Sequence, residues 1–140
     1  MLGNVRLKTA MALMMCTGLA TGACLITRAW ASEPFPFDRE LTMNARPMSG
    51  SKRLPTLEIA ADGAAKVGLW CYDGKGQFIV VGDAVSFIPG EVMPASCSDE
   101  QKQRDNALLN EMMQVTAWKM TGEVLTLIGP RNLEYRINTN

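Results

Sequence analysis

The fold is decided by residues 67–97, which read VGLWCYDGKGQFIVVGDAVSFIPGEVMPASC. The stretch begins with an alternating strand that ends at Cys71, continues through a glycine-rich turn at 73–76, and enters the apolar run 78–81. A second cysteine, Cys97, closes the stretch. Because short strands joined by tight glycine turns build antiparallel sheets, this stretch predicts a small β-rich domain that the two cysteines cross-link.

The first 31 residues have the features of a secretory signal peptide. Two basic residues precede a charge-free segment over 10–26, and the small residues Ala29 and Ala31 suit signal peptidase. We expect cleavage after Ala31, which leaves 109 of the 140 residues for the periplasm or for secretion. Two alternatives remain open: a lipoprotein anchored at Cys24, and an uncleaved membrane anchor.

The expected mature chain is mildly acidic. The whole sequence carries 14 basic and 14 acidic residues, but three of the basic ones lie in the leader, which leaves a net charge of −3. No run of lysine or arginine follows the leader. Because nucleic acids and anionic membranes select basic patches, we expect no nucleic-acid partner and no stable membrane insertion after cleavage.

Cleavage would also remove Cys16 and Cys24, so that Cys71 and Cys97 remain as an even pair. In an oxidising compartment a disulfide between them is the expected state, and two buried free thiols are the alternative. Such a bond would stabilise the domain by roughly 3.5 kcal/mol in the chain-entropy model.

From residue 56 onward, short runs alternate between apolar and polar residues, which is the pattern of half-buried strands. Asp62-Gly63, Gly82-Asp83 and Gly122-Glu123 predict tight turns between them. The run 78–81 is apolar on both faces, so we expect a central strand or one that the helix covers.

Three expectations concern the middle of the chain. Alternation from Val67 places Cys71 on the core side of its strand. Gly74 and Gly76 are explained by a hairpin turn that needs positive φ. Pro89-Gly90 is expected to end a strand, with residues 89–97 as a connecting loop.

One helix is expected over 99–116. Ser98, followed three residues later by Gln101, fits a capping box at its start. The helical spacing of apolar residues predicts a buried stripe at Leu108, Met112 and Val115.

These elements predict an α+β fold that is mainly antiparallel β. The sheet is curved or barrel-like with about seven strands, and the one helix is inserted before the C-terminal hairpin. The domain would span 41–140, behind a proline-rich linker at 32–40 whose phenylalanines pack on it.

The chain has no histidine, which excludes Ser-His-Asp and Cys-His catalysis and most zinc sites. Asp99 and Glu100 suit the positive end of the helix dipole better than an acid–base pair. The glycines at 68–76 lack the spacing of a phosphate-binding loop. We therefore expect no catalytic residue, no cofactor and no bound metal.

Aromatic residues and the loop after them offer the one candidate binding surface: Trp70, Tyr72, Pro89, Met93 and Pro94. The alternative is that the aromatic rings serve the core or the hairpins. For Trp118, which follows the helix and shares a strand face with Met120, we predict a core anchor.

The order of these motifs resembles the META domain family, which includes the heat-shock protein HslJ. The matching segments are Asp62-Gly63, Gly68-Leu69-Trp70-Cys71-Tyr72, Gly76-Gln77-Phe78, Ala95-Ser96-Cys97 and residues 122–127. Trp70 and Tyr72 replace the glycine and asparagine that flank the first cysteine in the family pattern. The resemblance implies this fold and a role in stress response or the cell envelope, without a defined reaction.

Export, a cross-linked fold and missing catalytic residues favour a non-enzymatic protein. We expect a monomer that supports envelope integrity or stress response by binding another envelope component. The alternative is a secreted inhibitor of a protease or lysozyme, with residues 89–96 as the wedge. A hydrolase acting through carboxylates is the third hypothesis.

Overall fold

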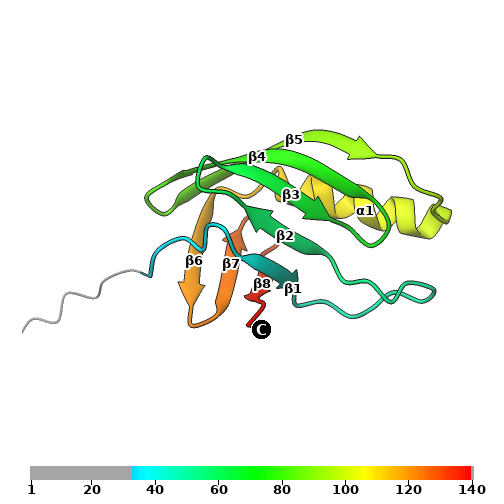
Figure 1. The fold of residues 1–140 in the computed structure, drawn as a ribbon, viewed down its shortest axis with the longest axis horizontal. Coiled ribbons are helices and arrows are strands. Elements are labelled where there is room, and N and C mark those ends of the chain that lie inside the picture. Colours follow the sequence, from blue (N-terminus) through cyan, green and yellow to red (C-terminus); the bar gives the residue numbers. More distant parts are fainter. Residues whose placement is uncertain (1–32, 140) are drawn as a thin grey trace, which may run out of the picture. The chain divides into compact units, whose positions relative to one another are not determined.

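A computed structural model describes residues 33–139 of the chain (Figure 1). The expected signal peptide and the alternatives to it lie outside the described residues. The elements in chain order are β1 (Glu40–Met43), β2 (Thr56–Ile59), β3 (Ala64–Gly68), β4 (Asp73–Val81), β5 (Ala84–Met93), α1 (Asp99–Met112), β6 (Ala117–Thr121), β7 (Val124–Ile128) and β8 (Leu133–Ile137).

The eight strands form a closed antiparallel ring in which each strand pairs with the next and β8 pairs with β1. The mainly antiparallel fold with one helix before the C-terminal strands is thus confirmed. Seven strands follow residue 56 as expected; the eighth, β1, is short and joins β2 to β8 through Leu41, which lies opposite both Leu57 and Ile137. The ring is uneven, because β5 and β6 share a single residue pair, Ala84 and Ala117.

The core fills the ring with side chains from alternate strand positions. The residues with the least exposed side chains include Leu41, Leu57, Ile59, Phe78, Leu125, Leu127, Leu133 and Tyr135. Because consecutive strands of this ring run in opposite directions, the connections that follow the odd-numbered strands all lie at the same end. These are residues 44–55, 69–72 and 129–132 together with the link to α1. We call this the helix-covered end.

Helix α1 begins as expected, with Ser98 and Gln101 forming the capping box, and buries Leu108 and Met112 against the ring. The Tyr135 hydroxyl lies 3.9 Å from the Met112 sulfur, which places the second half of α1 beside β8. The expected end at Thr116 is wrong by four residues. The chain must turn back into the ring there, and the Thr116 N–H already donates to the Ile128 carbonyl at 2.9 Å.

The predicted turn at Gly74 and Gly76 is also wrong, because both glycines lie inside β4 and neither has a positive φ. Gly76 is needed for a different reason: a Cβ there would collide with the ring of Phe87 on β5. The β4–β5 register shifts between the two glycines, and this irregularity lets β5 run through Pro89 to Met93. The connecting loop is therefore shorter than the predicted 89–97.

The N-terminal segment before β1 packs on the ring. Phe35 belongs to the buried core, and its ring meets Trp118 edge-on with centroids 4.9 Å apart. Asp38, which has a positive φ, donates its N–H to the Ile59 carbonyl. The phenylalanines of the predicted linker thus cover the domain, at the end of the ring opposite α1.

Candidate functional site

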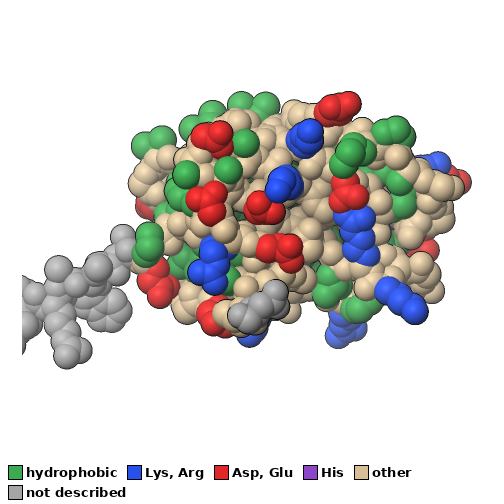
Figure 2. Space-filling model, viewed as in Figure 1, with side chains coloured by type: hydrophobic (Ala, Val, Ile, Leu, Met, Phe, Trp, Pro, Cys, Tyr) green, Lys and Arg blue, Asp and Glu red, His purple; other side chains and the backbone are tan. Residues whose placement is uncertain are grey.

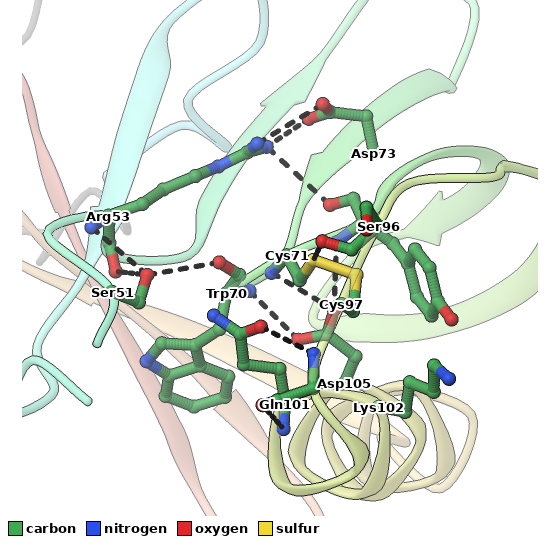
Figure 3. The surroundings of a disulfide bond; sticks show 12 residues. Ser51, Arg53, Trp70, Cys71, Asp73, Ser96, Cys97, Gln101, Lys102 and Asp105 are labelled. Atoms are coloured by element: carbon green, nitrogen blue, oxygen red, sulfur yellow. Dashed lines mark hydrogen bonds and ion pairs between the residues drawn. A yellow bond between two sulfur atoms is a disulfide. The ribbon is translucent and has the colours of Figure 1, made fainter. Parts of the chain in front are cut away.

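A buried carboxylate organises the helix-covered end. Asp105 on α1 has no exposed surface and accepts hydrogen bonds from three consecutive backbone N–H groups (Figure 3). The donors are Trp70 at 2.9 Å, Cys71 at 3.1 Å and Tyr72 at 2.8 Å. These residues leave the strand ladder between β3 and β4, so their N–H groups need acceptors from elsewhere. Asp105 supplies them and holds the turn against the helix.

The sequence argument missed Asp105, although a signal was present. The residue lies three positions before Leu108 and seven before Met112, so it belongs to the buried stripe of the helix. An acid on that stripe has to be paired or hydrogen-bonded, because burial of a free carboxylate is costly. The stripe therefore indicates a polar contact under the helix, although it does not identify the partner of Asp105.

The disulfide joins the same turn to the helix start. Cys71 and Cys97 are bonded, with their Cα atoms 6.0 Å apart, which confirms the expected cross-link. Cys71 is only half-buried, so its predicted inward orientation is wrong. The strand ends at Gly68, and the alternation that carried the prediction ends with it. The bond fixes the residue next to the helix cap, while Asp105 fixes the second turn of the helix.

A third set of contacts ties the loop before β2 to this turn. Ser51 donates from its hydroxyl to the Trp70 carbonyl at 3.1 Å (Figure 3). Arg53 forms an ion pair with Asp73, and one of its guanidinium nitrogens lies 3.2 Å from the carboxylate. The turn is thus held by a helix, a cross-link and a loop.

The structure does not bring the five predicted binding residues to one open face. Trp70 is only 8% exposed and belongs to the core, whereas Tyr72 is half-buried and packs against it. Pro89, Met93 and Pro94 are exposed, the first two within β5.

Trp118, predicted to be a core anchor, is half-buried rather than enclosed. Its ring packs against the core cluster, and its indole N–H donates to the Gly82 carbonyl at 2.9 Å. Trp118 therefore ties β6 to the β4–β5 turn from the rim of the ring.

An apolar surface lies on the outer face of the β4–β5 hairpin. Ile79 is 47% exposed, Val81 70% and Ile88 53%, and we call these three residues the hairpin patch. Figure 2 shows hydrophobic side chains along the upper edge of the molecule, over these two strands. The run 78–81 was expected in a central strand or in one that the helix covers, and β4 does lie between β3 and β5. Phe78 points into the core, but nothing in the described part of the chain covers the outward-facing Ile79 and Val81.

One titratable side chain is strongly perturbed. Burial, and secondarily the negative charge of Glu111, raises the pKa of Tyr135 well above its ordinary value of 10.0. Among residues 33–139, its hydroxyl has only the weak sulfur contact with Met112. Tyr135 therefore stays a neutral core residue over the physiological pH range.

Residues 33–139 contain no group of three or more cysteine or acidic side chains placed to hold a metal ion. In the same part of the chain, no helix is long and apolar enough to cross a membrane. Asp105, the acid that the fold buries completely, is engaged by three backbone donors.

An antiparallel ring with one helix over an end and a disulfide at that helix defines a small cross-linked β-rich domain. The chain belongs to the META domain family, whose model matches residues 27–137. The match confirms the resemblance in the motif order and extends it over the segment that carries Phe35.

Two solved structures share the fold. One is the NMR structure of a protein from Burkholderia xenovorans whose sequence is 17% identical to this chain. The TM-score is 0.56, and the match covers 81% of this chain and 97% of the other. A second NMR structure is 13% identical, with a TM-score of 0.54 over 71% of this chain and 89% of the other. At these identities the likeness concerns the fold alone. A comparison with curated proteins gave no match.

Proposed function

We propose that the protein is a non-enzymatic, exported META domain that supports the cell envelope or the stress response by binding another envelope protein. The observation that carries the proposal is the hairpin patch, where three large apolar side chains are about half exposed or more. Contiguous exposed apolar surface is a common mark of protein–protein contact sites. Val81, next to the tight turn at Gly82, is 70% exposed and thus accessible to a partner surface.

Export is supported by the leader-like first 31 residues together with the disulfide between Cys71 and Cys97. Stable disulfides form mainly in oxidising compartments such as the periplasm. The non-enzymatic part of the proposal is supported by the engagement of Asp105, whose oxygens accept three backbone hydrogen bonds and hold a turn.

The test is complementation of a deletion strain of the source organism under heat and envelope-directed antibiotics. We expect the wild-type gene to restore growth and an Ile79→Lys/Val81→Lys variant to fail, because two charges would abolish an apolar contact. Met113→Lys is the matched control: Met113 is 44% exposed and lies off the hairpin patch, at the end of α1. Equal growth of the patch variant and the control variant, or a deletion strain without any defect, would contradict the proposal.

A secreted inhibitor of a protease or lysozyme is the second candidate. The exposed segment 94–96 favours it, because β5 holds one end of the segment and the disulfide at Cys97 holds the other. Such a tethered loop is preorganised for insertion into an active-site cleft. Full activity of lysozymes and of common serine proteases and metalloproteases in micromolar protein would remove this candidate.

A further inference from the structure

A cleft opens at the helix-covered end, away from the hairpin patch. Its volume is about 360 Å³, and its walls come from β1 and the loop after it, the β3–β4 turn, α1 and the β7–β8 turn. A smaller hollow of about 60 Å³ adjoins it, and both are lined by Met43, Trp70, Arg104 and Arg131. A site of this size can hold a small organic molecule.

The charge of the cleft is positive although the expected mature chain is acidic. Arg46, Arg104 and Arg131 line it, against the single acidic side chain of Glu134. Arg131 is engaged by Glu111 at 3.0 Å. Within residues 33–139, Arg46 and Arg104 form no ion pair, so two guanidinium groups remain available for a ligand.

The floor of the cleft contains an unused hydrogen-bond donor. The Trp70 side chain is over nine-tenths buried, and its indole nitrogen has no acceptor in the described part of the chain. In Figure 3 the indole N–H points away from α1, while the backbone of the same residue is held by Asp105. A buried donor without a partner is costly and rare in folded proteins, and a bound acceptor is one of its ordinary explanations.

We propose that this cleft binds a small ligand through an oxyanion group, a carboxylate or a phosphate. Arg46 and Arg104 donate to the oxyanion, and the Trp70 indole N–H donates a further hydrogen bond. Arginine suits this role because its planar fork binds carboxylate and phosphate in two-pronged geometry. Met43 and the face of the indole ring offer apolar contact for the rest of the ligand. The indole nitrogen has almost no exposed surface in the free protein, so a ligand that reaches it must displace the side chains that cover it.

The experiment is a titration of the ¹⁵N-labelled, oxidised mature protein, followed by the indole N–H resonances of its two tryptophans. Inorganic phosphate is one probe and N-acetylglycine, a simple carboxylate, is the other, each at constant ionic strength up to about 50 mM. The Trp118 indole N–H already donates to Gly82 and serves as the internal control. Trp70→Phe assigns the two signals.

We expect the Trp70 signal to shift saturably with one or both probes while the Trp118 signal stays in place. The stronger probe decides between phosphate and carboxylate ligands. Arg46→Gln and Arg104→Gln should each weaken binding about tenfold or more, since each removes a charge-assisted contact. Arg136→Gln, an exposed arginine on β8 outside the cleft, should leave affinity unchanged.

A Trp70 signal that responds to neither probe would overturn the proposal. So would equal weakening by Arg104→Gln and Arg136→Gln, because binding would then follow net charge alone. Melting temperatures of the variants verify that they fold, since all three arginines are exposed. The hairpin patch plays no part in this measurement, so its result is independent of the proposed partner binding.

Discussion

Replacement of Asp105 by alanine should destabilise the domain strongly, although the residue is polar. The side chain has no exposed surface, and its removal leaves the N–H groups of Trp70, Cys71 and Tyr72 without their acceptor. An unsatisfied buried donor costs roughly 1–3 kcal/mol. The Trp70 N–H lies in a fully buried contact, whereas the other two contacts are partly buried and water can replace some of the loss. We therefore expect the free energy of unfolding to fall by about 3–5 kcal/mol.

The assay is urea denaturation of the oxidised mature protein, with amide hydrogen exchange at the three donor residues. Asp105→Asn should fall between wild type and alanine, because its carbonyl oxygen still accepts but its NH₂ group opposes a donor. Asn106→Ala is the control on the next, exposed helix position and should stay within about 0.5 kcal/mol of wild type. An Asp105→Ala loss below about 1 kcal/mol, with unchanged exchange at the three amides, would refute the reasoning.

Three further predictions concern other parts of the ring. Reduction of the Cys71–Cys97 bond should lower the free energy of unfolding by about 2–4 kcal/mol and loosen the start of α1 first. Melting and hydrogen exchange with and without reductant test this. Simultaneous loosening of β6 and β7 would contradict it. Gly76→Ala should lower the free energy of unfolding by about 1–3 kcal/mol in urea denaturation, because the new Cβ meets the Phe87 ring. Gly74→Ala should cost less, since a Cβ there would lie 3.6 Å from its nearest neighbouring atom. Equal losses for the two variants would refute this. Since the folded-state pKa of Tyr135 is raised, the contribution of this residue to stability is fully present below about pH 10 and should be lost above it by about 1.4 kcal/mol per pH unit. Tyr135→Phe should lack this decline in urea denaturation between about pH 9 and pH 11.5, and parallel curves for the two proteins would exclude the buried phenol as its cause.

The helix-covered end and the hairpin patch differ in how the structure supports the role proposed for each. At the helix-covered end, Asp105 and the disulfide hold one turn against α1, so that Trp70 is fixed at the floor of a cleft. The hairpin patch instead lies on two long strands whose inner faces are anchored by Phe78 and Phe87. A rigid support under an exposed apolar surface lowers the entropy cost of binding, which suits a docking site.

Local chemistry in the sequence was sufficient for the elements and most of their connections. The tight turns predicted at Gly63, Gly82 and Gly122 are present, and each of these glycines has the positive φ that such turns favour. Ser98 and Gln101 form the predicted capping box, since both partners lie within one helical turn. The pairing of Cys71 with Cys97 was predicted from the expected signal peptide and the cysteine count, which need no geometry.

The tertiary structure alone decided the features that join distant residues. Asp105 meets a turn 33 to 35 positions earlier in the chain, and no local pattern names that partner. Gly76 is required because a Cβ there would collide with the Phe87 ring on the neighbouring strand. The sequence does not reveal that contact, so a turn was predicted at Gly76 instead. The outer faces of Ile79 and Val81 remain open because α1 covers an end of the ring rather than these strands, a choice set by packing across the whole domain. Hydrophobic alternation specifies which faces can be buried, but the closure of the ring determines which of them are.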